Sequence, residues 1–224
     1  MSKVRIPIVE NIMDANQQIA NSNRDYFDEN KIFALNIMAS PGAGKTSLIL
    51  KTIKELSSIY KIGVIEGDTA PVTIDADKIT DLGMPAVQIN TGGQCHLDAL
   101  MVKNGLAQLP LDNLDLVIIE NVGNLICPAG FDLGTHTNIV ISSVPEGDDK
   151  PYKYPNIYRG IDVLIINKID LLDFVEFDME YFQKGVEILN PGLKTFPLSC
   201  RTGEGIGNWI KWVAKQIENK SNIK

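Results

Sequence analysis

The sequence predicts an α/β protein with a P-loop NTPase fold: a single, mostly parallel sheet of about seven strands with helices on both faces. Three observations support this prediction. Short β-rich runs alternate with helical stretches along the 224 residues. Several runs, such as Leu116–Ile119 and Val163–Ile166, are continuously apolar, which is typical of strands buried on both faces. A glycine-bearing loop also stands between the first predicted strand and a helix.

The strands are predicted where β-branched and apolar residues are bounded by turn formers. Their expected ranges are Phe33–Ser40, Lys61–Asp68, Pro85–Asn90, Asp115–Val122, Asn138–Val144, Val163–Lys168 and Lys194–Ser199. Helical patterns between them predict helices over Lys45–Ser57, Ile74–Leu82, His96–Leu106, Asp178–Leu189 and Ile206–Glu218.

A further helix is predicted at Val9–Asn30, which is rich in Asn, Asp and Gln. We therefore expect residues 1–30 to form an N-terminal helical segment and residues 31–224 to form the P-loop domain. The longest irregular segment is predicted at Pro145–Gly160, where Gly, Pro, Asp, Lys and three tyrosines gather.

Composition restricts the possible partners and compartment. The formal net charge is −7, which argues against a nucleic-acid backbone or an anionic membrane surface as the main partner. The N-terminus has no apolar signal region, and no apolar run approaches the ~20 residues of a membrane span. Three cysteines do not make a disulfide framework. We expect a cytoplasmic protein whose cysteines are free thiols or metal ligands.

The glycine-bearing loop has the context of a Walker A motif: strand, loop, Lys-Thr, helix. Its glycines allow backbone N–H groups to wrap phosphates, Lys45 offers a charge to the β- and γ-phosphates, and the Thr46 hydroxyl suits Mg²⁺. The usual first glycine is Ala39 here, at the end of the strand, where we expect a methyl group to be tolerated. The predicted phosphate-binding residues are Pro41, Gly42, Ala43, Gly44, Lys45, Thr46 and Ser47.

A second motif, Asn167-Lys168-Ile169-Asp170, follows a buried strand and resembles the Asn-Lys-x-Asp signature of GTPases. A carboxylate such as Asp170 accepts two N–H bonds from the guanine edge, a pattern that adenine does not supply, so the site would discriminate between bases. Ser199-Cys200-Arg201 resembles the last GTPase loop, and a plain loop is the competing interpretation.

Acidic residues near other strand ends are candidates for magnesium binding and catalysis. Glu120 ends an apolar strand that resembles Walker B, and Gly123 is the expected γ-phosphate sensor. The predicted catalytic residues are Lys45, Asp75 and Glu120. The predicted magnesium ligands are Thr46, Asp75 and Glu120. Helix capping is the alternative role for Asp75 and for Asp68, whose role stays open.

Cys95 and His96 are adjacent, and Cys127 lies four residues beyond Gly123. Thiolate and imidazole ligands suit Ni²⁺ or Zn²⁺, although the spacing is not that of a zinc finger. Three ligands leave the coordination shell incomplete, so water, another residue or a second subunit would complete it. The isolated Cys200 and His136 are predicted not to be metal ligands.

Thr91-Gly-Gly-Gln-Cys-His-Leu-Asp98, Glu120-Asn-Val-Gly-Asn-Leu-Ile-Cys-Pro-Ala129 and Phe131-Asp-Leu-Gly134, joined to the phosphate loop, resemble the hydrogenase nickel-incorporation GTPase family, HypB. The resemblance covers roughly residues 31–209. It implies a GTPase that dimerises around nucleotide and delivers nickel to the large subunit of [NiFe]-hydrogenase. It also implies a HypA-like zinc/nickel partner and metal ligation by Cys95, His96 and Cys127. The chain lacks the N-terminal cysteine motif and histidine-rich tract of some relatives, so a second high-affinity nickel site and metal storage are not expected.

Three alternatives stay open at this stage: a sibling metallochaperone GTPase for urease or cobalamin enzymes, a small-molecule kinase, and a non-catalytic metal-binding module. The cysteine placement disfavours the sibling metallochaperone, and the guanine motif disfavours the kinase. The intact Lys45, Thr46 and Glu120 disfavour the non-catalytic module. The expected mechanism couples GTP-dependent dimerisation to metal affinity through the loop that joins Gly123 to Cys127. Lys150 or Lys153 is a candidate for a contact to nucleotide across a dimer, and a solvated loop lysine is the alternative interpretation.

Overall fold

One seven-stranded sheet forms the centre of the molecule, in the order β3-β2-β4-β1-β5-β6-β7. The computed structural model describes residues 8–69, 74–110 and 114–222, with the backbone alone for residues 8–12 and 74–75. All six pairings between neighbouring strands are parallel, so the predicted mostly parallel sheet is confirmed. The strands are β1 (Phe33–Ala39), β2 (Ile62–Asp68), β3 (Ala86–Asn90), β4 (Leu116–Glu120), β5 (Thr137–Ser143), β6 (Val163–Asn167) and β7 (Lys194–Pro197).

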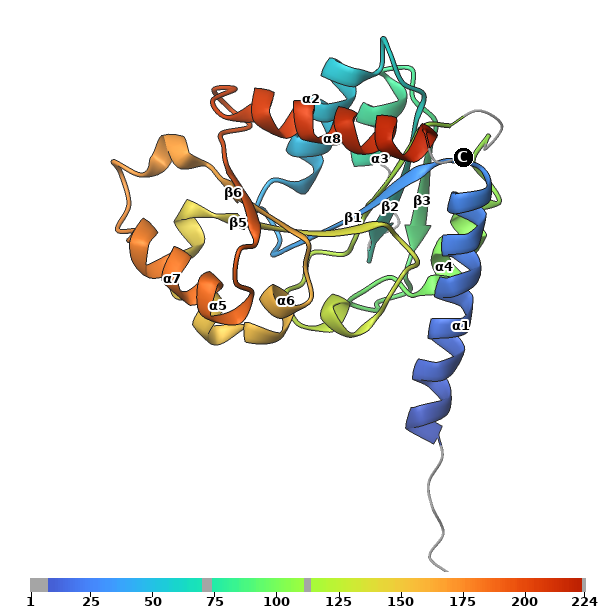
Figure 1. Ribbon diagram of the computed structural model, residues 1–224, viewed down its shortest axis with the longest axis horizontal. Helices are drawn as coiled ribbons and strands as arrows, with labels where there is room; N and C mark the ends of the chain where they lie inside the picture. The colour runs from blue at the N-terminus through green and yellow to red at the C-terminus, as the bar shows by residue number, and fades with distance from the viewer. Residues whose placement is uncertain (1–7, 70–73, 111–113, 223–224) are drawn as a thin grey trace, which may run out of the picture.

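Helices cover both faces of this sheet (Figure 1). Side chains of β1 alternate between the faces: Leu35 and Ile37 pack with α2 and α8, whereas Ala34 packs with α1 and α4, and Met38 with α6 and α7. Each face is therefore apolar, as the continuous hydrophobic strands predict. The main helices are α1 (Ile8–Glu29), α2 (Lys45–Leu56), α3 (Ile74–Thr80), α4 (Ala99–Leu106), α5 (Lys150–Lys153), α6 (Pro155–Arg159), α7 (Met179–Leu189) and α8 (Ile206–Ser221).

Two expectations about local structure are wrong. The segment expected to be irregular, Pro145–Gly160, contains a 3-10 helix, η2 (Val144–Glu146), followed by α5 and α6. All three short helices have proline in their first turn, where its fixed φ and missing N–H favour helix initiation. The helix expected from His96 begins instead at Ala99, because the Asp98 side chain accepts a hydrogen bond from the Met101 N–H at 2.7 Å and caps it.

The strand order opens a crevice above the sheet. The chain leaves β1 toward β2 on one side and leaves β4 toward β5 on the other, so the loops at the carboxyl ends of β1 and β4 diverge. Ligands of open parallel sheets bind at such a point. Within the described ranges, no helix is both long and apolar enough to cross a membrane.

Candidate functional site

The phosphate loop connects β1 to α2 at this crevice. Gly42 and Gly44 have φ values of 75° and 108°, in the left-handed region that favours glycine. A Cβ atom at Gly44 would lie 2.3 Å from Asn167 Nδ2, so a side chain there would also collide with the guanine motif. Since α2 starts at Lys45, the positive end of its dipole faces the crevice, as anion binding requires. The loop geometry therefore has the features of a phosphate cradle.

A cavity of about 630 Å³ lies over this loop and is lined by Lys45, Thr46, Glu120, Gly123 and, unexpectedly, Cys95. The Thr46 hydroxyl donates a hydrogen bond to Glu120 Oε1 at 3.0 Å, and Glu120 is 5% exposed. A hydroxyl and a buried carboxylate oxygen at this separation are hard oxygen donors of the kind that Mg²⁺ prefers. The predicted pair Thr46 and Glu120 therefore fits a magnesium ion bound beside the phosphates.

Glu66 is a residue at this cavity that sequence reasoning missed. It lies directly opposite Glu120 in the parallel register of β2 and β4, and it is 4% exposed. Two neighbouring buried carboxylates repel each other unless a cation or a shared proton compensates, and Lys45 lines the same cavity. The available signal was the position of Glu66 near the end of a strand, but its pairing with Glu120 depends on the strand order.

Asp68 and Asp75 are the other two candidate acids, and the structure describes the side chain of Asp68 alone. Asp68 lines the phosphate cavity at the end of β2, and its carboxylate accepts a hydrogen bond from the Thr69 N–H at 2.6 Å. Asp75 lies in the first turn of α3, but its side chain is outside the described residues. The magnesium and catalytic roles of Asp75 therefore stay predictions.

Asn167 joins three loops around a second cavity of about 270 Å³. Its Nδ2 donates to the Ala43 carbonyl at 2.8 Å, and its Oδ1 accepts from the backbone N–H groups of Lys168 at 2.8 Å and Cys200 at 3.1 Å. Lys168 Nζ donates to the Gly42 carbonyl at 2.7 Å. The guanine motif and the phosphate loop are thus bonded directly to each other, although about 120 positions separate them in the sequence.

Asp170 lines the same second cavity, and the buried Ser199 lies behind it. The Ser199 hydroxyl donates to Asp170 Oδ1 at 2.6 Å and accepts from the N–H groups of Arg201 and Thr202 at 3.2 and 3.1 Å. This bond orients a carboxylate at the wall of a pocket also lined by Cys200 and Arg201. Burial raises the pKa of the Cys200 thiol to about 11, so it lines the pocket as a neutral group. Residues 199–201, predicted to be the last GTPase loop, therefore contact the guanine motif.

The ligand atoms of Cys95, His96 and Cys127 lie within 4.8 Å of one another. They are the one group of three or more possible ligands of this kind among the described residues. A hydrogen bond with the Cys127 thiol raises the pKa of Cys95, whereas burial lowers the pKa of His96 and favours its neutral form. The His96 ring packs against the Phe131 ring, with 3.9 Å between ring centroids and 30° between ring planes. Two thiols and a neutral imidazole suit nickel or zinc.

The cluster of Cys95, His96 and Cys127 and the phosphate cavity share a boundary. Cys95 lines the cavity, and its carbonyl accepts a hydrogen bond from Asn124 Nδ2 at 3.2 Å. Gly123 packs against the phosphate loop so closely that a Cβ atom there would lie 3.2 Å from the Pro41 backbone. The five residues from Gly123 to Cys127 therefore connect the phosphate loop to a member of this cluster.

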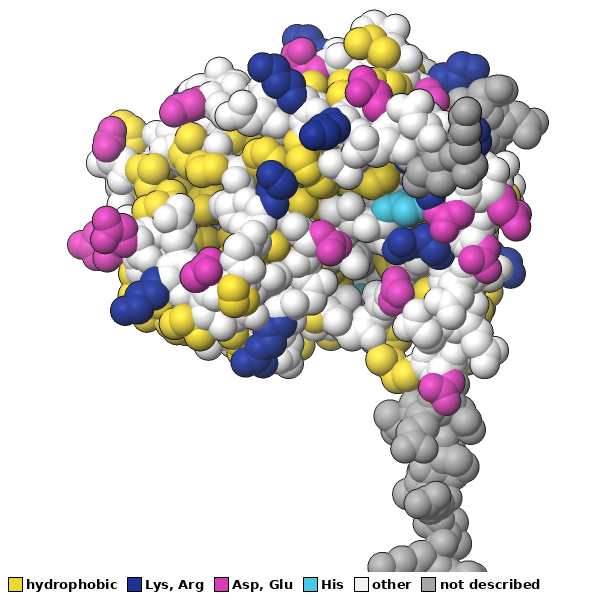
Figure 2. All heavy atoms as spheres, in the orientation of Figure 1, with side chains coloured by type: hydrophobic (Ala, Val, Ile, Leu, Met, Phe, Trp, Pro, Cys, Tyr) yellow, Lys and Arg dark blue, Asp and Glu magenta, His cyan; other side chains and the backbone are white. Residues whose placement is uncertain are grey.

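His136 is not part of this cluster, and its contacts are structural. Its Nδ1 accepts from the Ala34 N–H at 2.9 Å, and its Nε2 lies 2.9 Å from Asp28 Oδ1. Lys220 also bonds Asp28, which joins the ends of α1 and α8. Figure 2 shows a histidine between acidic and basic side chains on this face. The expectation that His136 is not a metal ligand is consistent with these contacts.

The lysines of the segment after β5 have local partners. Lys153 forms an ion pair with Asp149, and Lys150 Nζ lies 5.3 Å from the centroid of the Tyr154 ring. Both side chains therefore contact residues of α5 and the position after it, and the contacts across a dimer stay predictions.

The fold and the phosphate loop define a P-loop nucleotide-binding protein. The family model described as CobW/HypB/UreG, nucleotide-binding domain matches residues 33–197. The hydrogenase maturation factor HypB of Azotobacter vinelandii is 46% identical over 93% of this chain and 69% of its own length. The probable HypB of Methanocaldococcus jannaschii is 41% identical over 95% of this chain and 96% of its own.

Solved structures agree with these sequence comparisons. HypB from Helicobacter pylori in complex with nickel has a TM-score of 0.86 and 33% identity, and covers 92% of this chain and 96% of its own. HypB from Archaeoglobus fulgidus has a TM-score of 0.85 and 39% identity, with 91% and 99% covered. The signal recognition particle receptor FtsY of Elizabethkingia anophelis, at 14% identity and a TM-score of 0.53, shares the fold alone. The chain belongs to the HypB family of hydrogenase maturation factors.

Proposed function

We propose that this protein is a magnesium-dependent GTPase that uses its nucleotide state to control the binding and delivery of nickel or zinc during [NiFe]-hydrogenase maturation. The observation that carries the proposal is the shared position of Cys95, which lines the phosphate cavity and belongs to the Cys-His-Cys cluster. A change at the nucleotide would therefore reach a metal ligand directly. The nickel complex of the similar Helicobacter pylori HypB supports nickel as cargo.

The proposed GTP site divides into a phosphate part and a base part. Backbone N–H groups of the phosphate loop and the Lys45 ammonium group would bind the phosphates and neutralise charge that develops during hydrolysis. Thr46, Glu120 and Asp75 would hold Mg²⁺, which supplies further charge neutralisation when bound. Asp75 and Glu120 would orient the attacking water. Asn167, Lys168, Asp170 and residues 199–201 would bind the guanine base.

The proposed coupling runs through the segment from Gly123 to Cys127. Loss of the γ-phosphate would shift Gly123 relative to Pro41, and the short connection would move Cys127 with it. GTP would also bring two chains together, so that two three-ligand clusters meet and complete a metal shell. A HypA-like metallochaperone and the hydrogenase large-subunit precursor are the proposed partners, and the cytoplasm is the proposed compartment.

Calorimetric titrations of Ni²⁺ and Zn²⁺ test this proposal when performed with GDP and with a non-hydrolysable GTP analogue, while light scattering reports the mass. We expect tighter metal binding and a dimer only with the analogue. His96→Gln should weaken metal binding, and His136→Gln is the matched control because His136 lies outside the cluster. Equal metal affinity and equal mass in both nucleotide states would overturn the coupling. Absence of phosphate release from GTP would overturn the hydrolysis.

A further inference from the structure

Two asparagines on α1 each bridge the same pair of distant segments. Asn16 Oδ1 accepts from the Ala99 N–H at 2.9 Å, and Asn16 Nδ2 donates to the Asp132 carbonyl at 2.8 Å. Asn23 Nδ2 donates to the carbonyls of Ala99 at 2.9 Å and Leu133 at 3.1 Å. Seven positions separate the two asparagines, so they lie on one face of the helix, two turns apart.

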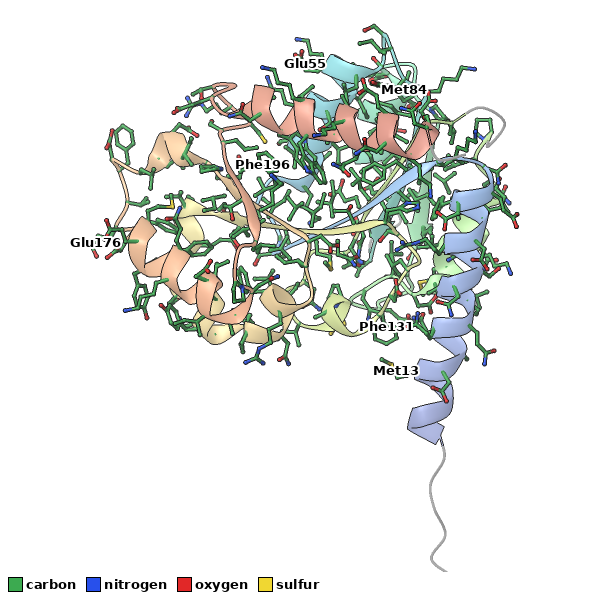
Figure 3. The ribbon with its side chains drawn as sticks, viewed as in Figure 1. Met13, Glu55, Met84, Phe131, Glu176 and Phe196 are labelled. Atoms are coloured by element: carbon green, nitrogen blue, oxygen red, sulfur yellow. The ribbon has the colours of Figure 1, made fainter. Side chains whose placement is uncertain are left out.

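The bridged segments are those that carry the metal ligands. Ala99 lies three residues after His96, and Asp132 lies five residues after Cys127. Between Cys127 and Asp132, Phe131 packs against the His96 ring, so the two segments also touch at the cluster itself. Figure 3 shows Phe131 alongside the N-terminal half of α1. The asparagines therefore form hydrogen bonds with the backbone of residues that flank the proposed ligands, and not with the ligands themselves.

Docking of α1 alone does not account for this arrangement. Phe27 and Ala20 of α1 are fully buried and already anchor the helix by apolar contact. Asn23 is 2% exposed, and a buried amide is unfavourable unless its hydrogen bonds are made. A side-chain amide can bond two backbone segments at once and hold them at a fixed separation, through its donor and its acceptor as in Asn16 or through both N–H groups as in Asn23.

We propose that Asn16 and Asn23 are positioning residues of the metal site and that α1 acts as a clamp that fixes the segment of His96 relative to that of Cys127. This inference rests on the proposed function, because it assumes that the cluster binds metal. Residues that orient metal ligands through hydrogen bonds commonly change metal affinity by about 10–100-fold when they are replaced. The bridges lie outside the nucleotide cavities, so nucleotide affinity should not change.

The test measures Ni²⁺ affinity of the full chain with GDP, by competition with a chromophoric chelator, together with the nickel–thiolate absorption spectrum. Asn16→Ala should weaken binding about tenfold or more and alter the spectrum, and Asn23→Ala should do the same. Asn16→Asp keeps the acceptor for the Ala99 N–H but loses the donor, so its affinity should be intermediate. Gln18→Ala on the same helix is the matched control, because Gln18 is exposed.

Each outcome decides a different claim. Nickel affinity and spectrum of Asn16→Ala equal to those of the parent chain would overturn the clamp. If GDP affinity falls in parallel with nickel affinity, the asparagines serve general stability and the clamp is again overturned. If Cys95→Ser also leaves nickel binding unchanged, the proposed metal site itself fails. Should Asn23→Ala not fold, Asn16→Ala decides alone, since Asn16 is partly exposed.

Discussion

Replacement of Asn167 by alanine tests whether one buried amide holds the nucleotide site together. The side chain is 2% exposed, and it makes three hydrogen bonds, to the Ala43 carbonyl and the N–H groups of Lys168 and Cys200. A neutral hydrogen bond contributes about 1 kcal/mol net, so about 3 kcal/mol is lost in total. This free energy divides between folding and nucleotide binding. Hydrogen bonds that are present without nucleotide stabilise the fold, whereas hydrogen bonds that form only when the loops are ordered by nucleotide strengthen binding.

We expect the dissociation constant of GDP to rise about 10–100-fold in Asn167→Ala, because about 1.4 kcal/mol corresponds to a factor of ten. Fluorescence titration with a labelled GDP measures this change, and denaturant unfolding without nucleotide measures the part lost from stability. Asn208→Ala is the control, since Asn208 is exposed on α8. A dissociation constant within a factor of two of the parent, with unchanged unfolding free energy, would refute the reasoning.

Three further predictions concern the phosphate loop, His136 and the metal site. Gly44→Ala should abolish GDP binding measured by calorimetry, because φ is 108° and the new Cβ would lie 2.3 Å from Asn167 Nδ2; binding within threefold of the parent would contradict this. Burial lowers the pKa of His136 to about 4, so on acidification the unfolded chain takes up this proton before the folded chain does. The free energy of unfolding should therefore fall as the pH drops from 6.5 to 4, by about 2 kcal/mol after discounting for solvent screening. Denaturant unfolding across that range checks the fall, which should be absent in His136→Gln. Nickel binding at pH 7.5 should release protons, because hydrogen bonding to Cys127 raises the pKa of Cys95; titration in two buffers of different ionisation enthalpy should give different heats, and equal heats would contradict it.

The sheet was predictable because its determinants are local. A strand buried on both faces must be apolar along its length, and the runs Val163–Ile166 and Leu116–Ile119 satisfy this before each strand ends in a polar residue of the site. The short helices after β5 were not predictable by the same reasoning. Their prolines resemble loop formers in the sequence, and their helical state depends on packing against α7 and on the polar contacts of Glu146 with Ser143.

The candidate site divides in the same way. The phosphate loop is encoded within eight residues, because its glycines and the following helix act on each other directly. Glu66 and the α1 asparagines could not be assigned from sequence. The position of Glu66 in the site depends on the strand register that sets it opposite Glu120. The bridging role of Asn16 depends on hydrogen bonds to segments 83 and 116 positions away in the sequence. Each depends on how distant elements are placed, which no local pattern records.

Buried amides connect several parts of this site. Asn121 Oδ1 accepts from the N–H groups of Leu97 at 3.1 Å and Val122 at 3.0 Å, which links the residue after His96 to the residue before Gly123. A charged side chain in this position, 1% exposed, would have a large desolvation cost and would perturb both the phosphates and the metal ligands. A neutral amide makes the same connection without competing for either ligand. The segments that would bind phosphate and metal are therefore joined through one amide oxygen, so a shift of either segment would change the hydrogen bonds of the other, as coupling between the two sites would require.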